Sequence, residues 1–231
     1  RTKLAIAGVP VTGQTLLVTA TAIVVAPRPT TVGNATIPPP QSAEKYPFIS
    51  GITNTSRQIF ISGRNAGNRI NVFSKVGDSI TISGAFLNGF GLNKYNLRDY
   101  QQDLEPVVKF YSQETAHNSN SFANTSLAAD TGWSTASIFV TDNRNKALCN
   151  ANETPLVCEY RTVRPAVSII MLGTNDVPGI QTGVFERNMR LIIEITTQMG
   201  IVPIISTIPP MLNRSDANRV PIFNTIIKAL A

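Results

Sequence analysis

The sequence predicts an α/β domain built around a central parallel sheet. Two nearly continuous apolar runs, Val167 to Leu172 and Ile201 to Thr207, are typical of strands that are buried on both faces of such a sheet. Between them, apolar residues recur every three or four positions over residues 185–199, which indicates an amphipathic helix. Strand, helix and strand in this order form a parallel βαβ unit. The length of 231 residues suits one such domain and a tail.

The elements before this unit follow from shorter patterns. We expect the folded domain to cover residues 57–231, with a short rim strand from Ile59 to Ser62. Asn71 to Val76 is predicted as the first central strand, and it leads into Gly77. These strands are expected to lie in one sheet with the two apolar runs.

Two further helices are predicted. The first runs from Glu105 to Gln113, because Pro106 stands at its opening and its apolar face consists of Val107, Val108 and Tyr111. The second follows the last apolar run, which two prolines break. Asp216 can cap this helix, which is expected to continue through Leu230.

The first 56 residues allow two interpretations. Arg1 and Lys3 precede an apolar run from Leu16 to Ala26, as in an export signal over residues 1–26. The alternative is that residues 15–25, where β-branched side chains are frequent, form the last strand of an upstream domain. Residues 27–56 are rich in Pro, Thr and Ser and are predicted as a linker. The apolar stretch is too short for a stable membrane span.

Composition and charge exclude several classes of protein. Charged residues make up 15% of the chain and hydrophobic residues 42%, which fits neither a disordered tail nor a multi-span membrane protein. The net charge of +6 comes from cations that are scattered singly between Arg57 and Arg219. This pattern favours a solvated basic surface, and we expect no nucleic-acid partner.

The two cysteines, Cys149 and Cys158, are too few for a zinc site with three or four ligands. In an oxidising compartment they can form a disulfide, which the chain-entropy estimate values at roughly 2.5–3 kcal/mol. Two unpaired loop thiols are the alternative. We expect neither a metal nor an organic cofactor.

Polar motifs follow the predicted strands, at the edge where the working residues of α/β sheets lie. They are Gly77-Asp78-Ser79, Asp130-Thr131-Gly132-Trp133-Ser134 and Gly173-Thr174-Asn175-Asp176. With these motifs, residues 70–231 resemble the SGNH or GDSL hydrolases. The resemblance implies a three-layer, flavodoxin-like fold and a serine ester hydrolase, lipase-like or esterase-like, that acts through an acyl-enzyme on carbohydrate or lipid esters.

The resemblance also implies roles for single residues. Ser79 matches the nucleophile, and the oxyanion hole would consist of the Ser79 N–H, the Gly132 N–H and the side-chain amide of Asn175. Gly84 and Gly89 compete with Gly132 for its place. Three neighbours are expected to be structural: Asp78 as an acceptor for loop amides, Asp176 as a residue that ties loops together, and Trp133 as part of the core.

The chain departs from the family in its last block, which places an Asp and a His three residues apart to supply the base. The one histidine, His117, lies in a polar loop and is expected to be solvated. We therefore expect a secreted or extracytoplasmic protein truncated before the last strand and the Asp-x-x-His block, and nearly inactive in this form. The alternative is a carbohydrate-binding module on the same scaffold that lacks a base.

Overall fold

The computed structural model describes residues 5–7, 17–19, 53–141, 147–212 and 214–231. The chain divides into two compact units, Arg1–Gln41 and Ser42–Ala231. In the first unit, β1 (Ala5–Ala7) pairs antiparallel with β2 (Leu17–Thr19). The rest of the predicted export segment, and the predicted linker up to residue 52, lie outside the described residues.

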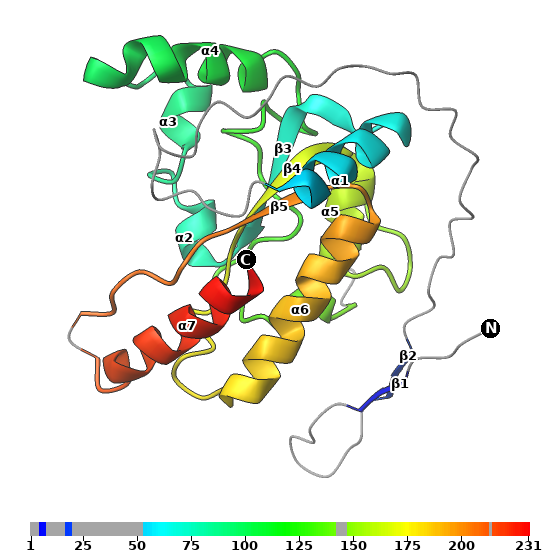
Figure 1. The fold of residues 1–231 in the computed structure, drawn as a ribbon, viewed down its shortest axis with the longest axis vertical. Coiled ribbons are helices and arrows are strands. Elements are labelled where there is room, and N and C mark those ends of the chain that lie inside the picture. Colours follow the sequence, from blue (N-terminus) through cyan, green and yellow to red (C-terminus); the bar gives the residue numbers. More distant parts are fainter. Residues whose placement is uncertain (1–4, 8–16, 20–52, 142–146, 213) are drawn as a thin grey trace. The chain divides into compact units, whose positions relative to one another are not determined.

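The second unit is built on a parallel sheet (Figure 1). Its strands lie in the order β3 (Arg69–Gly77), β4 (Pro165–Met171) and β5 (Val202–Ile205), and both neighbouring pairs are parallel. Each of the three strands in this sheet overlaps a predicted one. The prediction of an α/β fold with a central parallel sheet is therefore confirmed.

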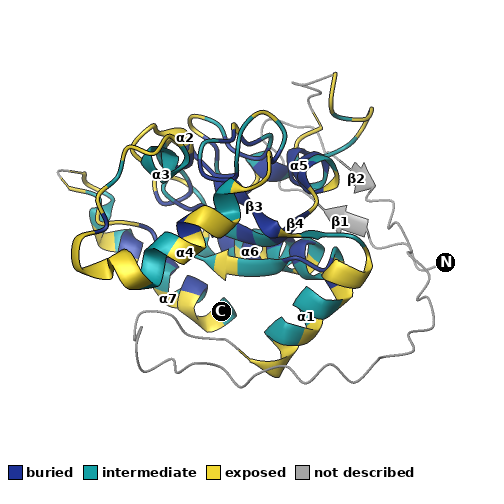
Figure 2. Cartoon of the chain, turned by 90° about the horizontal axis from the view of Figure 1, so that it is seen from above, coloured by how far each residue is buried: buried dark blue, intermediate teal, exposed yellow. Residues whose placement is uncertain are grey.

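Helices cover both faces of this sheet, which gives three layers. Successive strand residues point to opposite faces, so neighbouring residues of β3 join different hydrophobic clusters. Val76 belongs to the larger cluster, with buried side chains of α5 (Pro155–Val163), α6 (Thr182–Gln198) and α7 (Val220–Leu230). Phe73 packs on the opposite face with Val108 of α4 (Gln101–Ser112). In Figure 2, β3 is mostly dark blue, whereas α4 presents yellow, exposed residues.

Apart from α1, which is described below, the remaining helical segments of the described residues are short. They are α2 (Ser79–Ile82), α3 (Asn88–Gly91) and three 3₁₀ turns, at Arg98–Tyr100, Ser137–Phe139 and Ala217–Arg219. In the described ranges, no helix is both long enough and apolar enough to cross a membrane.

The start of the domain differs from the prediction. Residues 59–62, predicted as a rim strand, lie inside the helix α1 (Asn54–Asn65), which also begins before residue 57. The cause is a capping box: the Thr53 hydroxyl accepts the Ser56 N–H, and the Ser56 hydroxyl accepts the Thr53 N–H. This pair satisfies amides that a helix start otherwise leaves without partners.

Two other helix starts were predicted wrongly. Helix α4 begins at Gln101, so Pro106 lies inside it and not at its opening. Val108 is buried as predicted, but Val107 is 46% exposed and does not share its face. Asp216 makes no capping hydrogen bond, because its carboxylate binds the Arg214 guanidinium at 3.0 and 3.1 Å. A 3₁₀ turn leads into α7 instead.

Helix α1 approaches the rest of the domain very closely at one glycine. A Cβ atom on Gly63 would lie 1.8 Å from the carbonyl oxygen of Gly200, which follows α6. Beside this contact, the Asn68 amide donates to the carbonyls of Met199 and Gly200 at 3.0 and 3.1 Å. The backbone of α1 can therefore approach the start of β5 only because residue 63 has no side chain.

We expect Gly63→Ala to destabilise the protein, because the added methyl group overpacks this contact at a typical cost of about 1–3 kcal/mol. The matched control is Gly183→Ala, in the first turn of α6, where no atom lies within 4 Å of an added Cβ. Alanine favours a helix over glycine by about 0.5–1 kcal/mol, so the control should be neutral or stabilising. Urea denaturation of both variants measures the difference, and equal effects would contradict the close contact.

Candidate active site

The three polar motifs begin side by side at one edge of the sheet. Gly77, the last residue of β3, is the register partner of Met171 at the end of β4. Gly77 also forms a parallel bridge with Ala129, and its N–H donates to the carbonyl of Ala128 at 3.1 Å. The loops that follow residues 77, 129 and 171 therefore leave the sheet at neighbouring points.

Ser79 is placed by a sharp transition from strand to helix. A Cβ on Gly77 would lie 1.9 Å from the Thr81 hydroxyl and 2.7 Å from the Met171 carbonyl, so a glycine lets α2 begin immediately after β3. Asp78 caps this helix by accepting the Ile80 N–H on Oδ1 at 2.9 Å. Ser79 is the first residue of α2, and it is exposed.

The second and third motifs are joined by side-chain hydrogen bonds. The Asn175 amide nitrogen donates to the carbonyl of Trp133 at 2.9 Å. The buried Asp176 carboxylate accepts the Thr135 N–H at 2.9 Å and also the Thr135 hydroxyl. Asn188 of α6 donates to this hydroxyl at 3.1 Å. The expected role of Asp176 in tying loops together is confirmed.

Gly132 lies at the surface, whereas the next residue, Trp133, lies in the core. Gly132 is exposed and has a φ of +76°, a conformation that L side chains rarely adopt, and no atom lies within 4 Å of an added Cβ. Trp133 is 6% exposed and packs in the larger hydrophobic cluster, as expected. The competing Gly84 and Gly89 lie in the segment between α2 and the end of α3, outside the 130–135 loop.

Two buried carboxyl groups lie beneath this edge. Burial raises the pKa of Asp78, while hydrogen bonding to the Ile80 amide and the Thr174 hydroxyl opposes the shift. Its Oδ2 atom is buried without a hydrogen-bond partner in the described structure. Burial also raises the pKa of Asp176, and the nearby charge of Asp78 adds to this shift although Thr135 opposes it. Asp78 acts as a helix cap, which agrees with the structural role expected for it.

His117 is not brought to this edge. The residue is partly exposed, and its Nε2 atom lies 2.6 Å from the Thr125 carbonyl oxygen in an exposed hydrogen bond. Its backbone N–H donates to the Asn124 side chain at 3.1 Å. In the described part of the chain, it makes no hydrogen bond with Ser79, Gly132 or Asn175.

Sequence reasoning missed one residue that holds the third motif in place. Arg219, just before α7, donates from its guanidinium to the carbonyls of Val177 and Ile180, in the turn after Asn175. The guanidinium also lies 5.3 Å from the centre of the Phe223 ring. No local pattern indicates a contact between residues about 40 positions apart.

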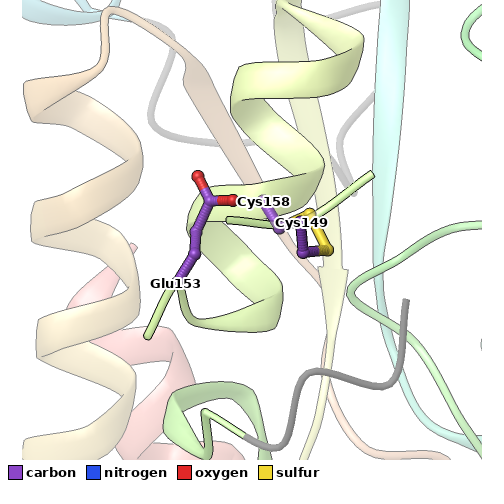
Figure 3. A group of neighbouring side chains, drawn as sticks. All are labelled: Cys149, Glu153 and Cys158. Carbon is purple, nitrogen blue, oxygen red and sulfur yellow. A yellow bond between two sulfur atoms is a disulfide. The ribbon is translucent and has the colours of Figure 1, made fainter. Parts of the chain in front are cut away.

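One group of described side chains has the residue types of a metal site. The ligand atoms of Cys149, Glu153 and Cys158 lie within 4.8 Å of one another (Figure 3). The two sulfur atoms form a disulfide, so the first of the two alternatives for the cysteines holds. Glu153 binds the Arg161 guanidinium at 2.7 Å, which holds the pKa of this carboxyl group below its usual range. Neither thiolate is available as a ligand while the disulfide is intact.

Comparisons with known proteins give structural similarities only. No family model matches the chain, and no curated protein matches it. Among solved structures, the chain is similar to a GDSL-like lipase from Bacteroides thetaiotaomicron, with 11% identity and a TM-score of 0.40 over 75% of this chain and 71% of that one. It is also similar to an acetyl xylan esterase, with 14% identity and a TM-score of 0.39 over 69% of this chain and 71% of that one.

We expect Asp78→Asn to raise the melting temperature at pH 7 by a few degrees, since about 1 kcal/mol corresponds to roughly 2–4 °C in a domain of this size. The amide keeps an oxygen for the Ile80 N–H and removes the buried charge. A raised pKa means that the carboxyl group contributes most to stability below its ordinary value of 3.8, and that this contribution is lost as the pH rises through the raised pKa. The gain in the variant should therefore disappear below about pH 3.8.

Asp216→Asn is the control, for which we expect the opposite change in melting temperature. Arg214 lowers the pKa of Asp216, so this ionised group contributes to stability above its ordinary pKa. The control should lower the melting temperature slightly at pH 7 and have no effect in acid. A lower melting temperature of Asp78→Asn at pH 7 would show that the ionised Asp78 stabilises the fold.

Proposed function

We propose that this protein is a serine ester hydrolase that forms an acyl-enzyme on Ser79. One observation carries the proposal: the Asn175 amide is held against the Trp133 carbonyl at 2.9 Å, next to Gly132, and both loops leave the sheet beside the strand that leads into Ser79. An exposed hydroxyl and two amide donors that start from neighbouring points form the components of an acyl-transfer site.

The Ser79 hydroxyl is the proposed nucleophile. Its oxygen attacks the ester carbonyl carbon, the hydroxyl proton passes to a base, and the base returns it to the departing alkoxide as the bond between carbon and alkoxy oxygen breaks. Water then adds to the acyl-enzyme, and the carboxylic acid leaves. Ser79 suits this role because it is exposed on a helix start that Gly77 and Asp78 hold against the sheet.

Three donors are proposed for the oxyanion: the N–H of Ser79, the N–H of Gly132 and the Asn175 side chain. An amide nitrogen carries two N–H groups. Because Asn175 donates one of them to Trp133, its plane is fixed and the second can point toward a substrate. The open space beside Gly132 supports this assignment, since a side chain there would narrow the approach to its N–H.

The base is the missing component of the proposal. His117, the one histidine of the sequence, binds Thr125 and makes no hydrogen bond with Ser79 in the described structure. A site without one member of its triad retains roughly 10³–10⁴-fold acceleration over water in a characterised serine hydrolase. We therefore infer that these 231 residues become acylated slowly and that an external base accelerates the reaction.

Substrate class and location are parts of the same proposal. We propose esters of carbohydrates or lipids as substrates. The disulfide between Cys149 and Cys158 supports an extracytoplasmic location, because such bonds persist in oxidising compartments.

The nucleophile is tested by mass spectrometry of the protein after incubation with p-nitrophenyl acetate, with and without added imidazole. We expect slow acetylation of Ser79 that imidazole accelerates, and no acetylation at this position in Ser79→Ala. The matched control is Ser83→Ala, which replaces an exposed serine at the end of α2. This variant should be acetylated at Ser79 as in the original protein. Binding of acetylated sugars without acylation would favour the binding-module alternative.

The oxyanion hole is tested by Asn175→Ala, which should lower the rate of Ser79 acylation about 10²–10³-fold, because the amide binds a charge that develops in the transition state. The concentration of ester that gives the half-maximal rate should change little. A change confined to that concentration would assign Asn175 to binding of the ground state. Ser83→Ala again serves as the control.

A further inference from the structure

A lysine is buried in β3, an outer strand of the three-stranded sheet, on the face that α4 covers. Lys75 lies in β3 and is 6% exposed. Its ammonium group donates to the carbonyl of Phe122 at 2.7 Å, which is its one hydrogen bond in the described structure. An ammonium group has three donors, and a buried charge is costly unless it is paired. Two of its N–H donors therefore have no partner among the described residues, in a buried position where an unpaired charge destabilises the folded state.

The nearest acid does not neutralise this charge directly. Glu159 is fully buried, but its two oxygens accept the Ser74 hydroxyl at 2.7 Å and the Leu127 N–H at 2.8 Å. Among the described residues, no carboxylate lies within ion-pair distance of Lys75. Burial lowers the pKa of Lys75, and the more distant Glu159 only partly opposes this shift.

Lys75 lines a small cavity next to the helix that begins with Ser79. The cavity has a volume of about 90 Å³, and Thr81, Ile82 and Ser83 form its side toward α2. Asn88, Asn124 and Ser126 add further polar groups. Of the described residues that line it, Lys75 alone is charged. The cavity thus combines one positive charge with neutral hydrogen-bonding groups.

An independent observation indicates that a polar partner belongs here. Thr81 is 2% exposed, and its hydroxyl oxygen has no hydrogen-bond partner in the described structure. Buried hydroxyl groups are normally paired, and leaving one without a partner is costly. A ligand with two acceptor atoms could accept from the Lys75 ammonium with one and from the Thr81 hydroxyl with the other.

We propose that this cavity binds a short carboxylate anion of the acetate class. A carboxylate carries one negative charge, which matches the single ammonium, and its two oxygens provide the acceptors that Lys75 and Thr81 lack. The proposed carboxylate site at Lys75 does not depend on the hydrolase proposal. Its use as a binding place for the acid released at Ser79 rests on that proposed function.

The test measures binding of sodium acetate to the full chain by calorimetry and by thermal shift, with sodium chloride at equal ionic strength as the reference. Acetate should bind saturably and raise the melting temperature, and chloride should not. Lys75→Met should weaken acetate binding about 10- to 100-fold, as expected for a hydrogen bond to a charged group. Lys94→Met, which removes an exposed lysine, is the matched control and should bind acetate normally.

Thr81→Val gives a second test if the lysine variant fails to fold. It removes the unpartnered hydroxyl at nearly constant volume and should weaken acetate binding about 3- to 10-fold. Equal binding of chloride, or equal losses in the two lysine variants, would overturn the proposal. Ser79→Ala should bind acetate as well as the original protein, and a loss in this variant would place the acetate at Ser79 instead. If the original protein binds acetate but is not acylated at Ser79, only the hydrolase proposal is refuted.

Discussion

The parallel register between β3 and β4 is the constraint on which the described domain depends. It sets Gly77 opposite Met171, so that the first and third polar motifs start at the same height of the sheet. The bridge from Gly77 to Ala129 adds the second motif on the other side. A slip of one residue would turn every side chain of β3 to the opposite face, exchanging Val76 and Lys75 between the two helical layers. The core and the candidate site are therefore fixed by the same hydrogen bonds.

At the sheet edge where the three polar motifs begin, two acidic groups are buried and two of the exposed groups are neutral. Asp78 and Asp176 are buried and use their oxygens to hold backbone amides, so they shape the loops without meeting solvent. The groups at the surface, Ser79 and Gly132, are uncharged and exposed. Asp78 and Asp176 thus hold the segments around Ser79 and Gly132 by accepting the Ile80 and Thr135 N–H groups.

Some of this arrangement could be predicted from the sequence, for a physical reason. Strands buried on both faces must be apolar along their whole length, so Val167 to Leu172 and its neighbours were recognisable. The motifs with Ser79 and Asn175 were expected after strands, and they follow β3 and β4, whereas the roles of the two residues stay predictions. Residues 59–62 looked like a strand because Ile, Phe and Ile are strand-forming, whereas the helix starts from a capping box at Thr53 that lies before them.

Long-range polar contacts could not be predicted in this way. Arg219 binds carbonyl groups 39 and 42 residues away, and Asp176 binds Thr135 at a separation of 41 residues. Such bonds depend on which loops the sheet brings together. Because every residue has a backbone carbonyl, the sequence does not indicate which carbonyl accepts a hydrogen bond. The charge of Lys75 likewise appeared to belong to a solvated surface until its place on the α4 face of β3 was known.

The close approach of α1 to Gly200 has a consequence for the order of folding. The Asn68 side chain reaches carbonyls 131 and 132 residues further along the chain. Contacts of such large sequence separation stabilise the fold only after the intervening chain has been ordered. The loss of conformational entropy on closing this long loop therefore precedes the gain from the contacts. Helix α1 should therefore dock late in folding, after α6 and β5 have formed. By the same reasoning its amides should exchange with solvent through a local opening that leaves the sheet intact.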